Sequence, residues 1–110
     1  MEIRIQDCRH FSAEEIIKAI MNRHTWLKKK ENRCYVYIGA TKDIKDRLRR
    51  HKATKILFCA QTANRRVASK VEEVANRLGF NIGDVSWGGN GTNSYSIYVY
   101  AYMIDKNTRQ

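Results

Sequence analysis

The feature that most constrains the fold of this chain is a strand that ends at a glycine and leads directly into a basic helix. Residues 33–38 alternate between two kinds of side chain, which predicts a strand with Tyr35 and Tyr37 on one face. Gly39 ends that strand, and Thr41 is placed to cap the helix that follows. A chain with this pattern must turn sharply at Gly39 and bring the end of the strand against the start of the helix.

The helix that follows is expected to run to about His51, and two of its side chains share a face. Arg47 and His51 are four residues apart, so both project from the same side of the helix. Asp43 and Asp46 lie in its first turns, where acidic residues complement the helix dipole. The pattern therefore predicts that an arginine and a histidine converge with the strand tyrosines around one turn.

The rest of the first eighty residues contains two more helix patterns. Ser12-Ala13-Glu14-Glu15 has the form of a capping box, and apolar residues follow at helical spacing, which predicts a helix over 12–23. Thr62 or Asn64 caps another helix that ends at Gly79. The remaining predicted elements are a strand beginning at 26–28, a turn at 29–32 and a strand at 55–61.

The helix before Gly79 contains two adjacent glutamates with different surroundings. Glu73 has Arg77 four residues on and is well placed for an ordinary surface ion pair. Glu72 has no basic partner at that spacing, and the small residues Ala68 and Ala75 leave space beside it. Of the two, Glu72 is the better candidate for a functional site.

The last thirty residues are predicted to form two strands, 84–87 and 95–104, on either side of a glycine-rich turn at 88–93. The second strand places three tyrosines on one face and Ile97, Val99, Ala101 and Met103 on the other. A row formed by Tyr98, Tyr100 and Tyr102 can stack on bases, line a dimer contact or belong to a strand that is buried on both sides.

The positive charge of this chain is localised. Residues 23–70 contain 15 Lys or Arg and three acids, a net charge of +12, whereas the flanking segments are each at −1. A concentrated basic segment is typical of a protein that binds a polyanion such as nucleic acid. The alternative is a solvated, solubilising surface, which suits scattered charge better than this cluster.

Length and composition limit the class of protein. A chain of 110 residues, 43% hydrophobic and 29% charged, fits one globular domain. No apolar run approaches the roughly 20 residues that span a bilayer, and the N-terminus has no signal-peptide pattern. Three cysteines at irregular spacings fit a reducing compartment, so a cytoplasmic, intracellular location is expected.

At residues 36–43, Arg47, His51 and Glu72 the chain resembles the GIY-YIG nuclease superfamily. The resemblance covers about residues 24–80. It implies an α+β domain whose core is a three-stranded antiparallel sheet flanked by helices. Residues 1–110 are then a single domain with an N-terminal helix, a core at 24–80 and a β-rich C-terminal extension at 81–110.

The resemblance also implies phosphodiester hydrolysis assisted by Mg²⁺ or Mn²⁺. Glu72 would hold the cation through one carboxylate, as a hard cation accepts. Arg47 would bind the scissile phosphate. Tyr37 would orient or deprotonate the attacking water, His51 would assist proton transfer or contact phosphate, and Gly39 would leave space for the substrate backbone.

One position departs from the family pattern. The family's first motif, Gly-Ile-Tyr, is expected about eleven residues before Tyr37, where this chain has His24-Thr25-Trp26. Indole cannot replace a phenol as a base. Three alternatives follow: Tyr37 suffices alone, Tyr35 substitutes, or the domain binds nucleic acid without cutting it.

The leading prediction is a metal-dependent DNA endonuclease, with RNA not excluded as the substrate. A catalytically inactive nucleic-acid-binding module on the same fold is the alternative, and a regulatory module that binds an acidic protein is a third. If the C-terminal tyrosine row lines a contact between two copies of the chain, the protein is a homodimer through that strand. The residues predicted to contact nucleic acid are Gly39, Lys42, Lys45, Arg49, Arg50, Lys52, Lys28, Lys29 and Lys30.

Overall fold

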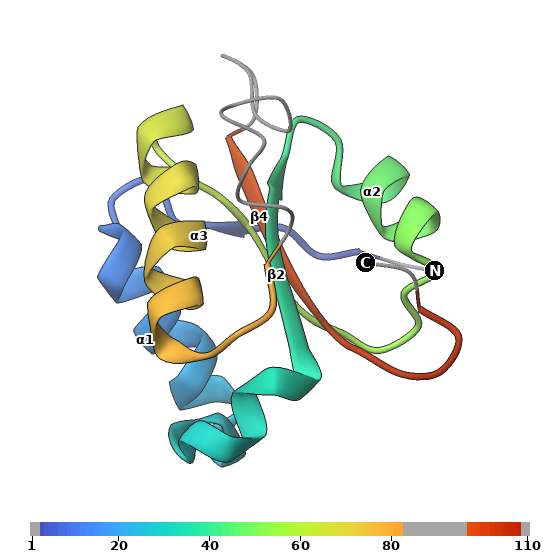
Figure 1. The fold of residues 1–110 in the computed structure, drawn as a ribbon. Helices are drawn as coiled ribbons and strands as arrows, with labels where there is room; N and C mark the ends of the chain where they lie inside the picture. Colours follow the sequence, from blue (N-terminus) through green and yellow to red (C-terminus); the bar gives the residue numbers. More distant parts are fainter. Residues whose placement is uncertain (1–2, 83–96, 109–110) are drawn as a thin grey trace.

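The computed structural model describes residues 3–82 and 97–108, which form a mixed β-sheet with helices on both faces (Figure 1). The predicted α+β class is confirmed. Two 3₁₀ helices, Thr25–Lys28 and Lys30–Tyr35, join the first helix to the second strand. The other elements are β1 (Gln6–Asp7), α1 (Ala13–Arg23), β2 (Val36–Thr41), α2 (Ile44–His51), β3 (Ile56–Gln61), α3 (Arg65–Leu78) and β4 (Tyr98–Met103).

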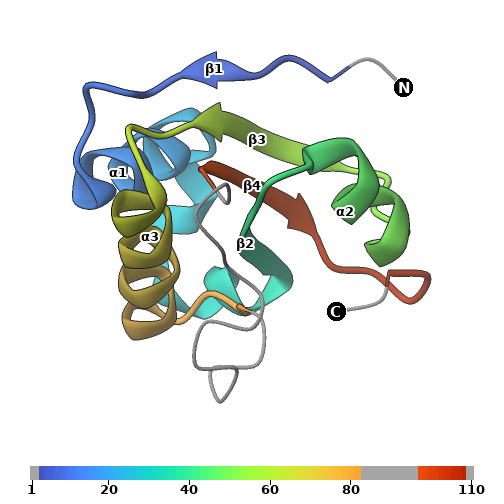
Figure 2. The same cartoon turned by 90° about the horizontal axis from the view of Figure 1, so that it is seen from above.

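The sheet has the strand order β1-β3-β4-β2, which corrects the expectation of three antiparallel strands (Figure 2). β4 is antiparallel to both β3 and β2, whereas the short β1 is parallel to β3. The C-terminal strand therefore lies inside the core sheet instead of forming an extension beside it. The backbone hydrogen-bonding groups of β4 pair with β2 on one side and with β3 on the other, and its middle residues are buried. The dimer contact expected through this strand is therefore not supported.

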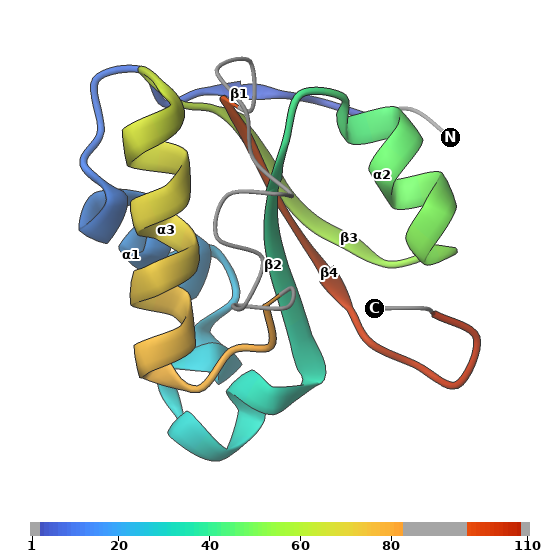
Figure 3. The same ribbon diagram turned by 45° about the horizontal axis from the view of Figure 1, so that its top comes forward.

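The two faces of the sheet have different layers against them. α1 and α3 cover one face, and α2 packs against the other (Figures 1 and 3). Apolar side chains from β2 and β4 point to the α1 and α3 side, in a core that includes Val36, Ile38 and Val99. The tyrosines of the same strands point to the α2 side. The predicted alternation of the last strand is thus confirmed, and burial on both sides is the correct one of its three alternatives.

Local sequence signals explain where the helices begin and end. The Ser12 hydroxyl and the Glu15 carboxylate exchange hydrogen bonds with each other's backbone N–H groups, which confirms the capping box of α1. Asn64 caps α3, and Gly79 ends it at a φ of 103°. The cap of α2 is Asp43 and not Thr41, because the Thr41 hydroxyl instead accepts from the Asp43 backbone N–H.

The segment 25–35 is the main error of the sequence-based prediction. It forms 3₁₀ helices where a strand at 26–28 and the first half of a strand at 33–38 were expected. The Arg33 guanidinium donates to the carbonyls of Leu27, Lys28 and Leu78, at 2.8, 3.2 and 3.0 Å. The Asn32 amide donates to a fourth carbonyl, that of Trp26. Because these side chains bind the carbonyls, the segment curls up and is fastened to the end of α3.

The strand expected at 84–87, the glycine-rich turn and the start of the strand expected at 95–104 lie outside the described residues. Within the described part, no helix is long and apolar enough to cross a membrane. Cys8, Cys34 and Cys59 are all free thiols.

Candidate active site

The site is built at the edge of β2 that has no neighbouring strand in the described part of the chain, which we call its open edge. The even-numbered residues of β2 turn their backbone groups away from β4, and Asn81 pairs with two of them: its carbonyl accepts from Ile38 and its N–H donates to Val36. The next N–H along this edge, that of Ala40, donates to Oε2 of Glu72 at 3.3 Å. Glu72 on α3 thereby reaches the edge of β2. The expectation that Gly39 ends this strand is wrong, because β2 stays paired with β4 through Gly39 to Thr41 and the chain turns only before Asp43.

Glu72 is buried in an environment that opposes its charge. The residue is only 6% exposed, and its Oε1 atom is buried and has no hydrogen-bond partner among residues 3–82 and 97–108. Burial raises the pKa of Glu72 to about 7, although the Ala40 N–H and the positive charge of Arg47 act in the opposite direction. A glutamine would accept the Ala40 hydrogen bond equally well without this cost. An ionisable group kept in such a place is typical of a functional site.

Tyr37 on β2 and Tyr100 on β4 are diagonal neighbours on one face of the sheet, since Tyr100 is paired with Gly39 and Tyr37 with Tyr102. Their rings are stacked with centroids 6.1 Å apart, and Tyr100 is hydrogen-bonded to the Tyr37 phenol. Burial raises the pKa of both phenols; the negative charge of Glu72 raises that of Tyr37 further, whereas the Tyr100 hydrogen bond and the Arg47 charge lower it. The structure thus brings a second phenol to Tyr37 from the last strand of the chain.

Gly39 explains how the two phenols come together. It is paired with Tyr100 in the sheet, and a Cβ atom at this position would lie 2.6 Å from the Tyr100 hydroxyl oxygen and 3.0 Å from a ring carbon of Tyr37. The space expected to receive the substrate backbone is therefore filled by Tyr100. Gly39 is itself buried, so its expected role as a nucleic-acid contact is wrong.

His51 lies beneath α2 and inside the aromatic cluster. It is 7% exposed, and its Nε2 atom is 2.9 Å from the Tyr100 hydroxyl. Its ring centroid is 4.8 Å from that of Tyr37 and 5.2 Å from that of Tyr102. Burial and these neighbours separate His51 from any phosphate on the surface. Of the two roles expected for His51, direct contact with phosphate therefore does not fit this position, whereas assistance to proton transfer through other side chains does.

Arg47 completes the group from the first half of α2. It is half-buried, and its positive charge lowers the pKa of Glu72, Tyr37 and Tyr100. Among the described residues its guanidinium makes no ion pair, because Asp43 caps the helix and Asp46 pairs with other arginines. The structure therefore brings together Tyr37, Arg47 and Glu72, as the sequence pattern predicted.

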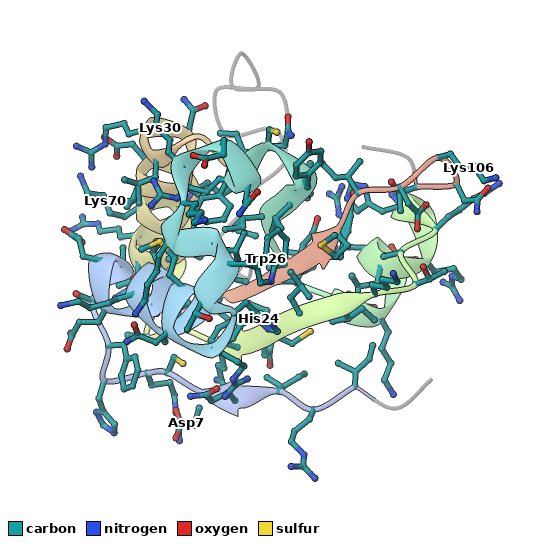
Figure 4. The ribbon with its side chains drawn as sticks, turned by 90° about the horizontal axis from the view of Figure 1, so that it is seen from below. Asp7, His24, Trp26, Lys30, Lys70 and Lys106 are labelled. Carbon is teal, nitrogen blue, oxygen red and sulfur yellow. The ribbon has the colours of Figure 1, made fainter. Side chains whose placement is uncertain are left out.

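Two aromatic residues considered for the site lie outside it. Tyr35 ends the second 3₁₀ helix, and its side chain is 54% exposed and absent from the cluster around Tyr37. It is not on the strand, so the expectation that it substitutes as a catalytic phenol is wrong. Trp26 packs against the core on the α1 and α3 side (Figure 4). Tyr100 is the phenol that the sequence pattern missed. The sequence did contain one signal for it: a row of tyrosines in the last strand and, at Gly39, a residue without a side chain that leaves room for one of their rings.

The predicted nucleic-acid contacts divide into two groups. One group lies on or next to α2, with every side chain exposed: Lys42, Lys45, Arg49, Arg50 and Lys52. The other group, Lys28, Lys29 and Lys30, is also exposed but belongs to the 3₁₀ segments. Figure 4 shows Lys30 on the α3 side of the molecule, away from α2.

The donors at this site fit one hard cation. Among residues 3–82 and 97–108, no group of three or more His, Cys, Asp or Glu side chains is arranged to hold a metal ion. Mg²⁺ does not need such a group, because it commonly takes one or two carboxylates and fills its other positions with water and phosphate oxygens. The unpartnered Oε1 atom of Glu72 is an oxygen ligand of the required kind.

Comparison with known families supports the same interpretation. The GIY-YIG catalytic domain model matches residues 24–78, half of the chain, and the chain belongs to this family. Its members are generally endonucleases that act on DNA and typically use divalent metal ions, which indicates a nuclease-type function with a nucleic-acid partner. Comparisons with curated proteins and with solved structures gave no match.

Proposed function

We propose that this protein is a metal-dependent endonuclease that hydrolyses phosphodiester bonds of DNA at the open edge of β2. The observation that supports this most directly is Glu72, a buried carboxylate with one unpartnered oxygen, beside Arg47 and the Tyr37 phenol. A glutamine at this position would make the same hydrogen bond to Ala40 without a buried charge, so a purely structural role does not explain the glutamate. Three free cysteines are in keeping with an intracellular location.

Each residue has a role that its position supports. Glu72 holds Mg²⁺ or Mn²⁺ through Oε1, and the bound cation supplies charge stabilisation for the phosphate and the leaving oxygen. Arg47, with a guanidinium that has no protein partner among the described residues, binds the scissile phosphate through paired hydrogen bonds. Tyr37 orients the attacking water and, in the phenolate form that has first released its own proton to solvent, accepts a proton from it.

Tyr100 and His51 act through Tyr37. Tyr100 has a single hydroxyl proton; when it donates that proton to Tyr37, His51 must donate its Nε2–H to Tyr100. This arrangement fixes the position of the Tyr37 oxygen and stabilises negative charge on it. Tyr100 thus supplies a phenol in place of the motif tyrosine that is Trp26 in this chain. This favours a nuclease over the inactive binding module.

Plasmid nicking tests this proposal. Purified protein is incubated with supercoiled DNA and Mg²⁺ or Mn²⁺, with and without a chelator. Wild-type protein should nick the plasmid only with the cation, and Glu72→Gln and Arg47→Ala should each reduce the rate by roughly a hundredfold or more. Glu73→Gln is the matched control, because Glu73 is exposed and forms only an ion pair with Lys70.

The outcomes separate the two functions. If the wild-type protein binds DNA but never nicks it under these conditions, the inactive binding module is the correct alternative. Equal loss of activity in Glu72→Gln and Glu73→Gln would contradict the assignment of Glu72, and nicking that survives the chelator would contradict the cation.

A further inference from the structure

A basic hollow lies on the side of α2 opposite to Arg47. Its volume is about 580 Å³, and it is formed by α2, residues 52–54 that follow it and Ile3 in the segment before β1. Its apolar lining comes from Ile3, Leu48 and Ala53. A volume of this size falls in the roughly 300–1,000 Å³ range of small-molecule sites. Nothing in the proposed active site uses this hollow.

The remaining lining is cationic. Lys45 and Arg49 lie four residues apart on one face of α2, and Lys52 is the residue that ends this helix. Lys45 and Lys52 are exposed and form no ion pair with the described residues, and Arg49 shares Asp46 in an exposed pair that a phosphate can replace.

One acid lies next to this lining. The Thr54 hydroxyl, also in the hollow, donates to Asp105 at 3.4 Å. The Asp105 carboxylate accepts hydrogen bonds from the backbone of Asn107 and Thr108, so it is already engaged in the turn that follows β4. These hydrogen bonds do not remove the negative charge of Asp105, but the three cations of the lining outnumber it, so the balance of charge in the hollow is positive.

Lys52 provides an independent observation. Its φ is 56°, the only positive φ of a non-glycine residue in the described chain, at the position that ends α2. The same position of α3 is Gly79, the residue type that adopts this conformation without strain. A lysine is retained at α2 where glycine would be more stable, and its side chain lines the hollow. Local strain of this kind is frequent at functional sites.

We infer that this hollow binds an unpaired nucleotide of the nucleic-acid substrate, with the base over the apolar lining and the adjoining phosphates against Lys45, Arg49 and Lys52. The inference rests on the proposed function, since the same strand must reach both sides of α2. A base inside a duplex cannot reach the lining, because it is stacked and paired. Other single-strand sites combine a cationic groove with aromatic platforms for the bases, whereas here the base would contact the aliphatic side chains of Ile3 and Leu48.

The unpaired nucleotide determines the kind of substrate. Because a base that is stacked and paired must first leave the duplex to enter the hollow, the preferred substrate is a duplex with an unpaired tail or flap.

Binding measurements without a divalent cation test this inference. Fluorescence anisotropy compares a short duplex, the same duplex with a short unpaired tail on either strand end, and a tail of equal length that lacks bases. The normal tail should improve the affinity of the wild-type protein roughly tenfold, and the abasic tail should not. Lys45→Ala combined with Lys52→Gly should abolish this preference.

Two controls accompany the groove variant, by which we mean Lys45→Ala combined with Lys52→Gly. Lys18→Ala combined with Lys70→Ala removes the same charge from the exposed surfaces of α1 and α3 and should keep the tail preference. The Lys52→Gly change alone should raise the melting temperature by roughly 2–5 °C, which shows that any lost binding does not come from unfolding.

The possible results are distinct. A groove variant that keeps the full tail preference, or an abasic tail that binds as well as the normal one, overturns the inference. Wild-type protein that binds duplex and tailed duplex equally also overturns it but leaves the proposed function intact. Wild-type protein that binds no nucleic acid, even at low salt, removes both.

Discussion

The two faces of strands β2 and β4 are made from alternate residues of the same segments, yet they differ in kind. Toward α1 and α3 they present aliphatic side chains such as Val36, Ile38 and Val99. Toward α2 they present Tyr37, Tyr100 and other rings around His51. The first face supplies apolar burial and therefore stability, whereas the second holds hydroxyl and imidazole groups in fixed positions.

The comparison also explains why the candidate site is at an edge. Glu72 belongs to α3 on the aliphatic side, but its carboxylate passes the open edge of β2 and affects Tyr37 on the aromatic side. Arg47 approaches from α2. A position at the sheet edge is where side chains from both layers can meet without crossing the sheet. Substitutions on the two faces should therefore separate stability from activity.

The largest expected effect is on the aliphatic face. Ile38→Ala removes a fully buried side chain from the centre of β2 and should lower the free energy of unfolding by about 2–5 kcal/mol. Chemical denaturation measures this change. Ile5→Ala is the control, because Ile5 is 45% exposed and its loss should cost little. A similar small cost for both variants would contradict the assignment of this face as the stabilising core.

Gly39→Ala tests the aromatic face by crowding it. The new methyl group would lie 2.6 Å from the Tyr100 hydroxyl and must displace one of the two rings, at a cost of roughly 1–3 kcal/mol. The nicking rate should fall even under conditions where the variant remains folded, because displacement of one ring separates the phenols of Tyr37 and Tyr100.

A double-mutant cycle distinguishes this clash from a general effect of the strand. In a Tyr100→Ala background the Gly39→Ala change should be nearly neutral for the free energy of unfolding. If the cost of Gly39→Ala is the same in both backgrounds, Tyr100 is not what Gly39 accommodates.

Glu72→Gln should stabilise the protein while it removes activity. Because burial raises the pKa of Glu72 from 4.5 to about 7, ionisation in the folded state costs up to about 3 kcal/mol above pH 7. The unpaired amide of the glutamine offsets part of this, which leaves a net gain of up to about 2 kcal/mol at pH 8.

The sign of this effect depends on pH. The folded state holds the Glu72 proton more tightly than the unfolded chain does, so the stability contributed by this group is full below pH 4.5 and falls as pH rises to about 7. The gain of Glu72→Gln over wild type should therefore appear between pH 4.5 and 7 and persist above that range. Thermal melts of both proteins across pH measure it, and a pH-independent difference would contradict the raised pKa.

Local patterns were enough to predict much of the fold and of the site. The capping box at Ser12, the helix ending at Gly79 and the placement of Glu72 away from ion pairs all depend on neighbours within four residues. The order of a strand that contains Tyr37 and a helix that contains Arg47 is equally local, although the turn between them was predicted too early, at Gly39. Each of these signals is present in a short window of the sequence.

Long-range pairing was not available from such windows. The segment 25–35 has strand-like residues, and only the hydrogen bond from Arg33 to Leu78, 45 residues away, shows why it coils. Tyr100 likewise reaches Gly39 through pairing of β4 with β2. A second tyrosine was expected before Tyr37 in the sequence, whereas the structure supplies it from the opposite end of the chain.

The smallest expected change in stability distinguishes two tyrosines of β4. Tyr100→Phe keeps the ring but removes the hydroxyl that contacts Tyr37 and His51, and it should cost about 0.5–1.5 kcal/mol. Loss of that hydrogen bond raises the pKa of Tyr37, since the bond lowers it in the wild-type protein. The rise of nicking activity with pH should therefore move to higher pH. Tyr102→Phe, a hydroxyl deletion on the same face of β4, should leave the profile in place, and equal shifts for both variants would show that Tyr100 has no specific role.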